Sequence, residues 1–223
     1  MNKKMLSFVV LTVMFFSASA QQTSTDAPKI RFGVFFNPLV SWTKIEGSQI
    51  ESDGSRMGFN AGLAMDKFFA PHYAFSTGIS IQNMGGTVNY KNRTTPFRAK
   101  DNVLPSLPVN TSVTYKLQYL HIPFSLKMRT SEIGYFTYYA ELGINPMINI
   151  KANTDVPSVN IKNTNISDEI NFGYLGYHAT LGLEYKIAGG SSLYTGLTYL
   201  NGITNVTSDV TLHCVELRVG IFF

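Results

Sequence analysis

The most constraining feature of this 223-residue sequence is an unbroken alternation of side chains from Tyr174 to Ile187. Every second residue is apolar, and most of the residues between them are small or polar. A β-strand sends successive side chains to opposite faces, so a period of two indicates a strand and excludes an amphipathic helix. The segment therefore predicts one long strand with an apolar and a polar face. The apolar face holds Leu175, Tyr177, Ala179, Leu181, Leu183, Tyr185 and Ile187.

The same alternation recurs along the chain and predicts about eight strands. The last strand is the clearest copy, because its apolar series continues to Phe223, the final residue. One strand of this kind also fits a water-soluble β-sandwich, whose apolar faces pack against a second sheet. The expected strands lie near residues 29–37, 59–66, 73–82, 119–128, 136–145, 174–187, 192–200 and 214–223.

The connections separate the two architectures, since they alternate between short and long. Tight turns are expected at residues 69–72, 129–133 and 188–191, and long polar loops at 41–55, 85–112 and 151–169, with a shorter loop at 201–208. Charged residues make up 14% of the chain, against about 25% in typical soluble domains. Thinly charged strands with short periplasmic turns and longer external loops are typical of outer-membrane barrels. We therefore expect an all-β, antiparallel, up-and-down transmembrane β-barrel.

The N-terminus predicts export. Lys3 and Lys4 precede an apolar run over residues 5–16, and small residues 17–20 form a cleavage site before Gln21, as in a secretory signal peptide. The run is shorter than the roughly 20 residues of a membrane-spanning helix. We expect a signal peptide at 1–20, a short segment at 21–28 and the barrel at 29–223, located in the outer membrane of a Gram-negative bacterium.

Charge and cysteine content exclude several other classes. Cleavage removes two lysines and leaves 16 basic and 14 acidic residues, an excess too small to indicate a nucleic-acid partner. The single cysteine, Cys214, does not follow the cleavage site, so neither a lipid anchor nor an internal disulfide is expected. No Cys or His cluster has metal-binding spacing, and no cofactor is expected.

The polar faces of the strands carry charged residues that would point into the barrel. Four acids and four bases occupy these positions, and buried charges require partners, so we expect internal ion pairs. Side chains fill an eight-strand barrel, which argues against a wide pore. Pro123 and Pro146 lie within strands and remove ladder donors, so bulges are expected at both. The expected interior network is Arg31, Asp66, His121, Lys127, Glu141, Glu184, Lys186, Glu216 and Arg218.

A catalytic site is the alternative interpretation of this interior. A turn centred near residues 131–132 would set His121 opposite Glu141, where a carboxylate can orient an imidazole. Ser125 lies four residues from His121, about 13 Å along a strand. That separation is too large for a nucleophile and its base to form a hydrogen bond. We therefore expect no catalytic residues.

Two further sites are expected at the membrane boundaries. The loop with Lys91, Arg93, Arg98 and Lys100 would meet the phosphorylated lipopolysaccharide of the outer leaflet, although a solvated loop has the same composition. Phe223 shares the lipid-facing series and would join the periplasmic aromatic girdle. Similarity to other outer-membrane barrels implies that the barrel assembly machinery reads this C-terminal aromatic residue.

The stretch Tyr119-Leu120-His121-Ile122-Pro123, followed by residues 124–127, resembles the PorT-like outer-membrane β-barrel proteins of Bacteroidetes. Residues 20–22, residues 143–146 and the aromatic C-terminus resemble that group too, while His121 stands where the group often has Glu. The resemblance implies a barrel and a link to protein secretion. We expect a structural or surface-interaction role in contact with outer-membrane lipid; a secretion or envelope-assembly component and a lipid-modifying enzyme are the alternatives.

Overall fold

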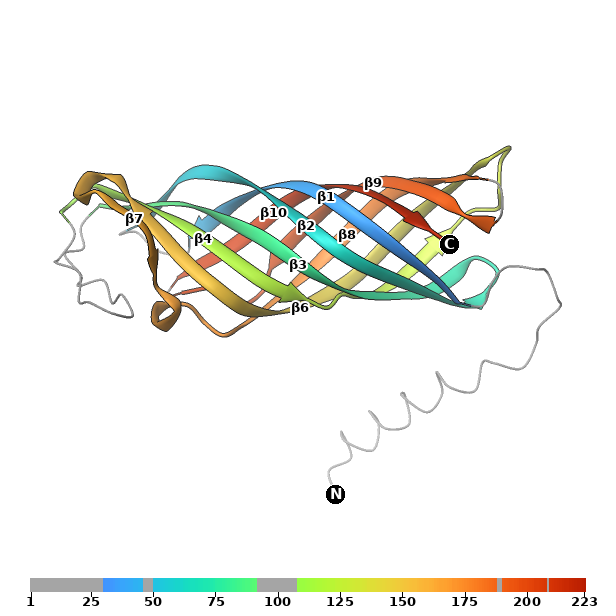
Figure 1. The fold of residues 1–223 in the computed structure, drawn as a ribbon, viewed down its shortest axis with the longest axis horizontal. Coiled ribbons are helices and arrows are strands. Elements are labelled where there is room, and N and C mark those ends of the chain that lie inside the picture. Colours follow the sequence, from blue (N-terminus) through green and yellow to red (C-terminus); the bar gives the residue numbers. More distant parts are fainter. Residues whose placement is uncertain (1–29, 46–49, 92–107, 188–189, 208) are drawn as a thin grey trace, which may run out of the picture.

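The computed structural model describes residues 30–45, 50–91, 108–187, 190–207 and 209–223, which form an antiparallel barrel of long tilted strands (Figure 1). The fold predicted from the alternation is confirmed. No helix in these ranges is long and apolar enough to cross a membrane. The strands are β1 (Ile30–Ile45), β2 (Ile50–Ala70), β3 (Tyr73–Tyr90), β4 (Thr111–His121), β5 (Phe124–Arg129), β6 (Phe136–Val156), β7 (Ile161–Asn165), β8 (Gly173–Lys186), β9 (Ser192–Gly202) and β10 (Val210–Phe222).

Nine of these ten strands occupy eight positions around the ring. Strands β4 and β5 both pair with β3 and β6, so they are two halves of one interrupted strand. Strand β7 pairs with β6 and lies beside the ring path. The ring closes where β1 pairs with β10, from Gly33 opposite Phe222 to Ile45 opposite Val210. Closure gives each wall strand a partner on both sides.

The predicted faces are observed in the wall. On β8, Leu181 is 71% exposed and its neighbour Thr180 is 2% exposed. On β10, Leu217 and Val219 point outward, and Glu216 is buried inside. The outer surface therefore carries a continuous apolar band, and the polar faces line the interior.

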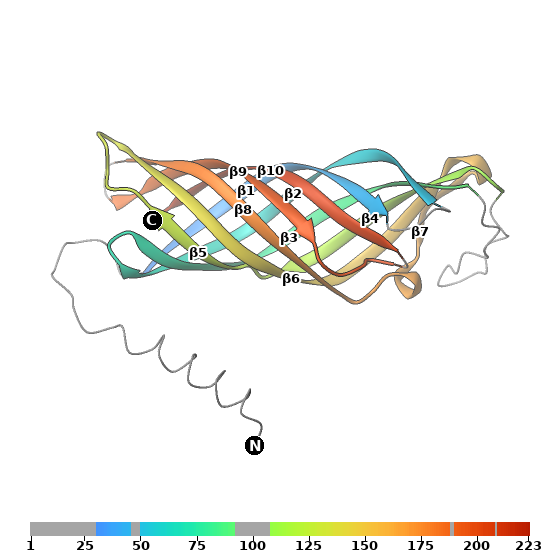
Figure 2. The same ribbon diagram turned by 180° about the vertical axis from the view of Figure 1, so that it is seen from behind.

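The strands extend further than expected at the end of the barrel that is opposite the C-terminus (Figures 1 and 2). Strand β1 runs to Ile45, β2 begins at Ile50, β3 continues to Tyr90, and β6 continues to Val156. The expected loops at 41–55, 85–112 and 151–169 are therefore wrong in extent, because much of each is strand. Short 3-10 turns at Pro157–Val159 and Ser167–Glu169 flank β7. In an outer-membrane barrel with an even strand number, this extended end is extracellular.

The two prolines do not create bulges at their own positions, which corrects the prediction. Pro123 lies in the interruption between β4 and β5, where Thr77 donates a 2.7 Å hydrogen bond to its carbonyl. Pro146 lies within β6, opposite Leu175 in regular register. The bulge occurs four residues further along β6, at Ile150, where the register with β4 shifts between Gln118 and Tyr119.

Candidate functional site in the barrel interior

The periplasmic half of the interior contains an ion-pair layer built on Arg31 and Lys127. Arg31 binds Glu184 through two hydrogen bonds of 2.6 and 2.7 Å, and it also binds Asp66 at 2.8 Å. Lys127 lies 3.0 Å from Asp66 and 2.8 Å from Glu184. Ser76 donates a further 2.6 Å hydrogen bond to Asp66. Two cations and two carboxylates therefore neutralise one another where water is excluded.

Aromatic rings frame this layer. The Arg31 guanidinium lies 4.1 Å from the centroid of the Phe222 ring, and the Lys127 ammonium lies 4.3 Å from that of Tyr139. Tyr194 stacks on Phe222 with centroids 4.7 Å apart. Ring faces attract cations, so the aromatic residues hold both charges in place and close the periplasmic end.

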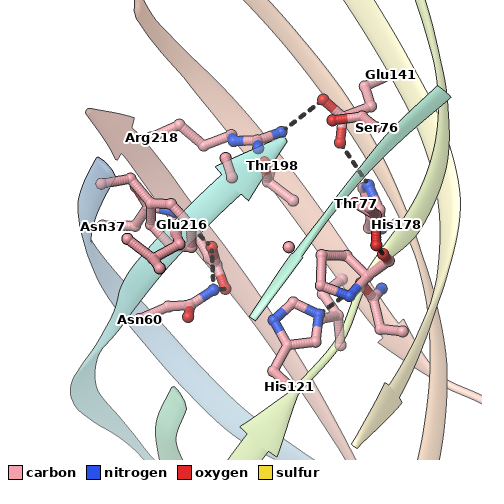
Figure 3. Close-up of a pocket in the computed structure, with 17 residues that line it drawn as sticks. Asn37, Asn60, Ser76, Thr77, His121, Glu141, His178, Thr198, Glu216 and Arg218 are labelled. Atoms are coloured by element: carbon pink, nitrogen blue, oxygen red, sulfur yellow. Dashed lines mark hydrogen bonds and ion pairs between the residues drawn. The ribbon is translucent and has the colours of Figure 1, made fainter. Parts of the chain in front are cut away.

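A second polar group lies around a small cavity at mid-height (Figure 3). Arg218 binds Glu141 at 2.8 Å, and Nε2 of His178 lies 3.3 Å from Glu141 and 3.2 Å from Ser125. The cavity volume of about 30 Å³ fits one or two waters. Its lining includes buried polar atoms without a protein partner, among them His178 Nδ1 and Asn145 Nδ2.

The sequence-based pairing of His121 with Glu141 is wrong. The register places Glu141 opposite Lys127, six residues away along the strand from His121. His121 instead lies 3.2 Å from Ser80 and 2.9 Å from Asn145. The expected turn centre was wrong because the hairpin turns at residues 134–135, between the bridged residues Ile133 and Phe136.

The side chains of Ser125, His178 and Glu141 do not have the geometry of a catalytic triad. A triad uses one imidazole nitrogen for the nucleophile and the other for the carboxylate. Here Ser125 and Glu141 both contact Nε2 of His178. His178 is also the residue that the sequence reasoning missed, although it lies on the predicted polar face of the 174–187 strand.

The carboxylate of Glu216 is hydrogen-bonded by side-chain amides. Asn37 donates to this carboxylate at 3.2 Å, and Asn60 lies 3.4 Å away (Figure 3). Gln82 donates to the same carboxylate at 2.9 Å. Within the described ranges, the ion pairs around Asp66, Glu141 and Glu184 have no counterpart at Glu216. Its carboxyl group is therefore satisfied by side-chain amides and not by an ion pair.

Lys186 does not belong to the interior. It lies at the periplasmic end of β8, where its side chain is 58% exposed and pairs with Glu132 at 3.0 Å. The expected placement in the network is wrong for this residue. The eight other predicted network residues are buried or half-buried in the barrel.

The extracellular half of the interior contains a large apolar cluster, which the sequence reasoning missed. Tyr119, Leu117 and Met84 point inward and are at most 1% exposed. Ile166 and Ile170, from the segment between β7 and β8, fold onto this cluster. We call it the apolar plug, and it consists of Leu39, Ile50, Met84, Val88, Val113, Tyr115, Leu117, Tyr119, Met147, Ala152, Val156, Ile166, Ile170, Tyr174, Leu200, Val206, Val210, Leu212 and Cys214.

The predicted boundary sites are only partly described. Lys91 is exposed and forms an ion pair with Glu51, while Arg93, Arg98 and Lys100 lie outside the described residues. Phe223 is 63% exposed and exchanges backbone hydrogen bonds with Phe32 on β1. No cluster of metal-ligating side chains occurs in the part of the chain that the structure describes.

A closed antiparallel barrel with an apolar outer wall and a filled interior defines a small outer-membrane β-barrel protein. The family model described as "Outer membrane protein beta-barrel domain" matches residues 19–208, and the chain belongs to this family. Its place is the outer membrane, where its wall contacts lipid.

Solved structures with a similar fold come from several bacteria. Neisserial surface protein A is 17% identical, with 86% of this chain and 95% of that one covered and a TM-score of 0.49. OprG of Pseudomonas aeruginosa is 12% identical, with 89% and 98% covered and a TM-score of 0.47. Ail of Yersinia pestis is 14% identical, with 88% and 100% covered and a TM-score of 0.44. No curated protein matches the chain.

Proposed function

We propose that this protein is a closed, non-enzymatic outer-membrane barrel that presents its extracellular hairpins as an interaction surface. The observation that carries the proposal is the filled interior. The ion-pair layer around Arg31 and Lys127 occupies the periplasmic half, and the apolar plug occupies the extracellular half. A path for solutes would have to cross both a charged layer and a packed apolar cluster.

The extracellular hairpins support the interaction role. Strands β2, β3, β4 and β6 continue beyond the apolar band, and Glu51 and Asp53 are exposed there. Rigid strands that hold polar side chains above a membrane are suited to binding, because little ordering is needed on contact. The charged loop with Lys91, Arg93, Arg98 and Lys100 adds a contact with lipopolysaccharide phosphates.

Conductance in planar lipid bilayers tests the closed barrel. The folded protein is expected to give no steady single-channel current. A double variant, Tyr119→Ala with Tyr174→Ala, shortens the apolar plug and leaves the ion-pair layer in place, so it is also expected to stay closed. A steady current through the wild-type protein would contradict the proposal.

Membership of the PorT-like group of Bacteroidetes and a part in secretion stay predictions from the resemblance around Tyr119–Pro123. Copurification from crosslinked envelopes tests them, since a secretion component is expected to retain other envelope proteins. The lipid-modifying enzyme is tested by the acylation pattern of lipid A in cells that overproduce the protein, which we expect to be unchanged. Cleavage before Gln21 is tested by N-terminal sequencing of the outer-membrane form.

A further inference from the structure

The lipid-facing wall contains an apolar groove that spans β4, β6 and β8. Its volume is about 450 Å³, within the range of roughly 300–1,000 Å³ that is usual for small-molecule sites. Leu120, Ile122 and Phe124 line it along β4 and β5, Ile148 lines it from the central strand β6, and Leu175 lines it from β8. The groove opens outward, because Phe124 is 41% and Ile148 is 36% exposed.

The groove exists because β6 and β8 end at different levels along the barrel axis. Strand β8 begins at Gly173, opposite Ile148, while β6 continues for eight more residues to Val156. Gly173 has no side chain, and a Cβ placed there would meet no atom within 4 Å. Phe172 and Ile203, which precede the lining residues Gly173 and Thr204 in the sequence, are 73% and 55% exposed. The missing side chain and the strand end leave a hollow in an otherwise filled surface.

A cation lies above the groove because of the bulge in β6. Ile150 and Lys151 are consecutive and both exposed, and Ala152 is fully buried in the apolar plug. If the strand alternated strictly through Ile150 without a bulge, Lys151 would point into the barrel. A bulge re-aims a side chain in this way, and here it places the Lys151 side chain on the lipid-facing side, two ladder positions beyond Ile148, or about 7 Å at 3.3 Å per residue.

Lys151 also differs from its neighbour on β4. Lys116 forms an ion pair with Asp155, whereas the described carboxylates form no ion pair with Lys151. The cation is at the extracellular end of the apolar band, where lipid phosphates are found. An apolar groove below a cation that has no ion pair among the described residues matches an amphipathic anion.

We infer that this groove is a specific lipid site, which takes one acyl chain of the phosphorylated glycolipid of the outer leaflet while Lys151 binds its phosphate. In a bilayer, acyl chains contact the whole wall, so burial of apolar area alone does not select a site. A hollow that a chain fills gains dispersion contacts that a flat wall does not offer. The cation supplies the preference for an anionic head group.

Native mass spectrometry of the detergent-purified barrel tests this inference, with purified bis-phosphorylated lipid A, phosphatidylglycerol and phosphatidylethanolamine as probes. The wild-type protein is expected to retain one lipid A molecule and to bind both phospholipids more weakly. Gly173→Leu fills the groove and is expected to weaken lipid A binding about tenfold, which is about 1.4 kcal/mol. Lys151→Gln is expected to weaken it about fivefold, the effect of about one lysine at a charged membrane surface.

Matched controls distinguish the site from the general wall. Ala179→Leu adds the same side chain on the outer face of β8 away from the groove, and Lys44→Gln removes an exposed cation on β1. Both are expected to bind lipid A as the wild-type protein does. Equal losses in the controls, or phosphatidylglycerol bound as tightly as lipid A, would overturn the inference. Because Lys151 is exposed, its variant keeps the test decisive even if Gly173→Leu fails to fold.

Discussion

The ion-pair layer makes a quantitative prediction through Asp66. This carboxylate binds Arg31 and Lys127 and accepts a hydrogen bond from Ser76, and it is fully buried. Asp66→Asn keeps the size of the side chain and removes its charge, so two cations remain with the single carboxylate of Glu184. Breaking a buried pair in this way costs about 3–5 kcal/mol. We expect a loss of that size in the free energy of unfolding.

Glu216→Gln is the matched control, because it makes the same chemical change at a carboxylate held by amides. Neutral amides can reorient toward an amide oxygen, so one or two weakened hydrogen bonds cost about 1 kcal/mol or less. Adding Lys127→Met to Asp66→Asn should recover part of the loss, since one cation and one carboxylate then remain.

Urea unfolding from lipid vesicles, followed by the fluorescence of the single tryptophan Trp42, measures these differences. Heat-dependent migration on gels confirms that each variant is folded at the start. Equal costs for Asp66→Asn and Glu216→Gln would refute the reasoning, because the two carboxylates would then be equivalent despite their different partners.

Three further predictions concern the wall, the C-terminus and the ion pair between β4 and β6. Leu181→Arg places a cation in lipid and should lower the free energy of unfolding by about 2–4 kcal/mol near the bilayer midplane. Leu181→Ala should lower it by less than about 1 kcal/mol, because this residue packs on lipid and not on protein. The reverse order in vesicle unfolding would contradict the face assignment. Deletion of Phe223 removes its backbone hydrogen bonds with Phe32. It should reduce outer-membrane insertion in cells far more than it reduces folding into detergent. Unchanged surface levels of the deletion variant would show that Phe223 is not an assembly signal. The Lys116 ammonium holds the pKa of Asp155 below its usual value. At a pH above the ordinary pKa of an aspartate, this ion pair therefore stabilises the extracellular ends of β4 and β6. That contribution to stability is lost as the pH falls through the lowered pKa. Lys116→Gln should therefore raise the pKa of Asp155 in a carboxyl NMR titration, and an unchanged titration would show that the ion pair is absent in solution.

The wall was predictable from the sequence because a single physical rule governs it. Lipid on one side and a filled interior on the other force alternation, as in Thr180 and Leu181. The register of a hairpin depends instead on the position of its turn. The turn lies at Gly134, whose positive φ of 67° suits the first central position of a tight hairpin turn. That glycine was the available signal for placing Glu141 opposite Lys127.

The apolar plug was missed because its pattern is the inverse of the membrane pattern. Along β4, Tyr115, Leu117 and Tyr119 point inward, and Lys116 and Gln118 point outward. This is the arrangement of a sheet in water, with apolar residues inside. Between Tyr119 and Leu120 the apolar residues switch from the inner face to the outer face of the strand. This switch marks where the wall leaves the lipid. The tertiary contacts of Ile166 and Ile170 have no comparable signal, because they depend on how a connection folds back.

The pairing of β1 with β10 also determines when the molecule is able to fold. The backbone N–H of Val219 donates a hydrogen bond to the side-chain oxygen Oδ1 of Asn37 across 182 positions of the sequence, so the ring stays open until nearly the whole chain is available. Contacts between such distant residues make folding slow. During that delay the first and last strands expose unpaired edges, which template aggregation. The unclosed chain therefore depends on being held apart from other copies until it reaches the membrane, and a chain truncated before β10 has no route to a closed state.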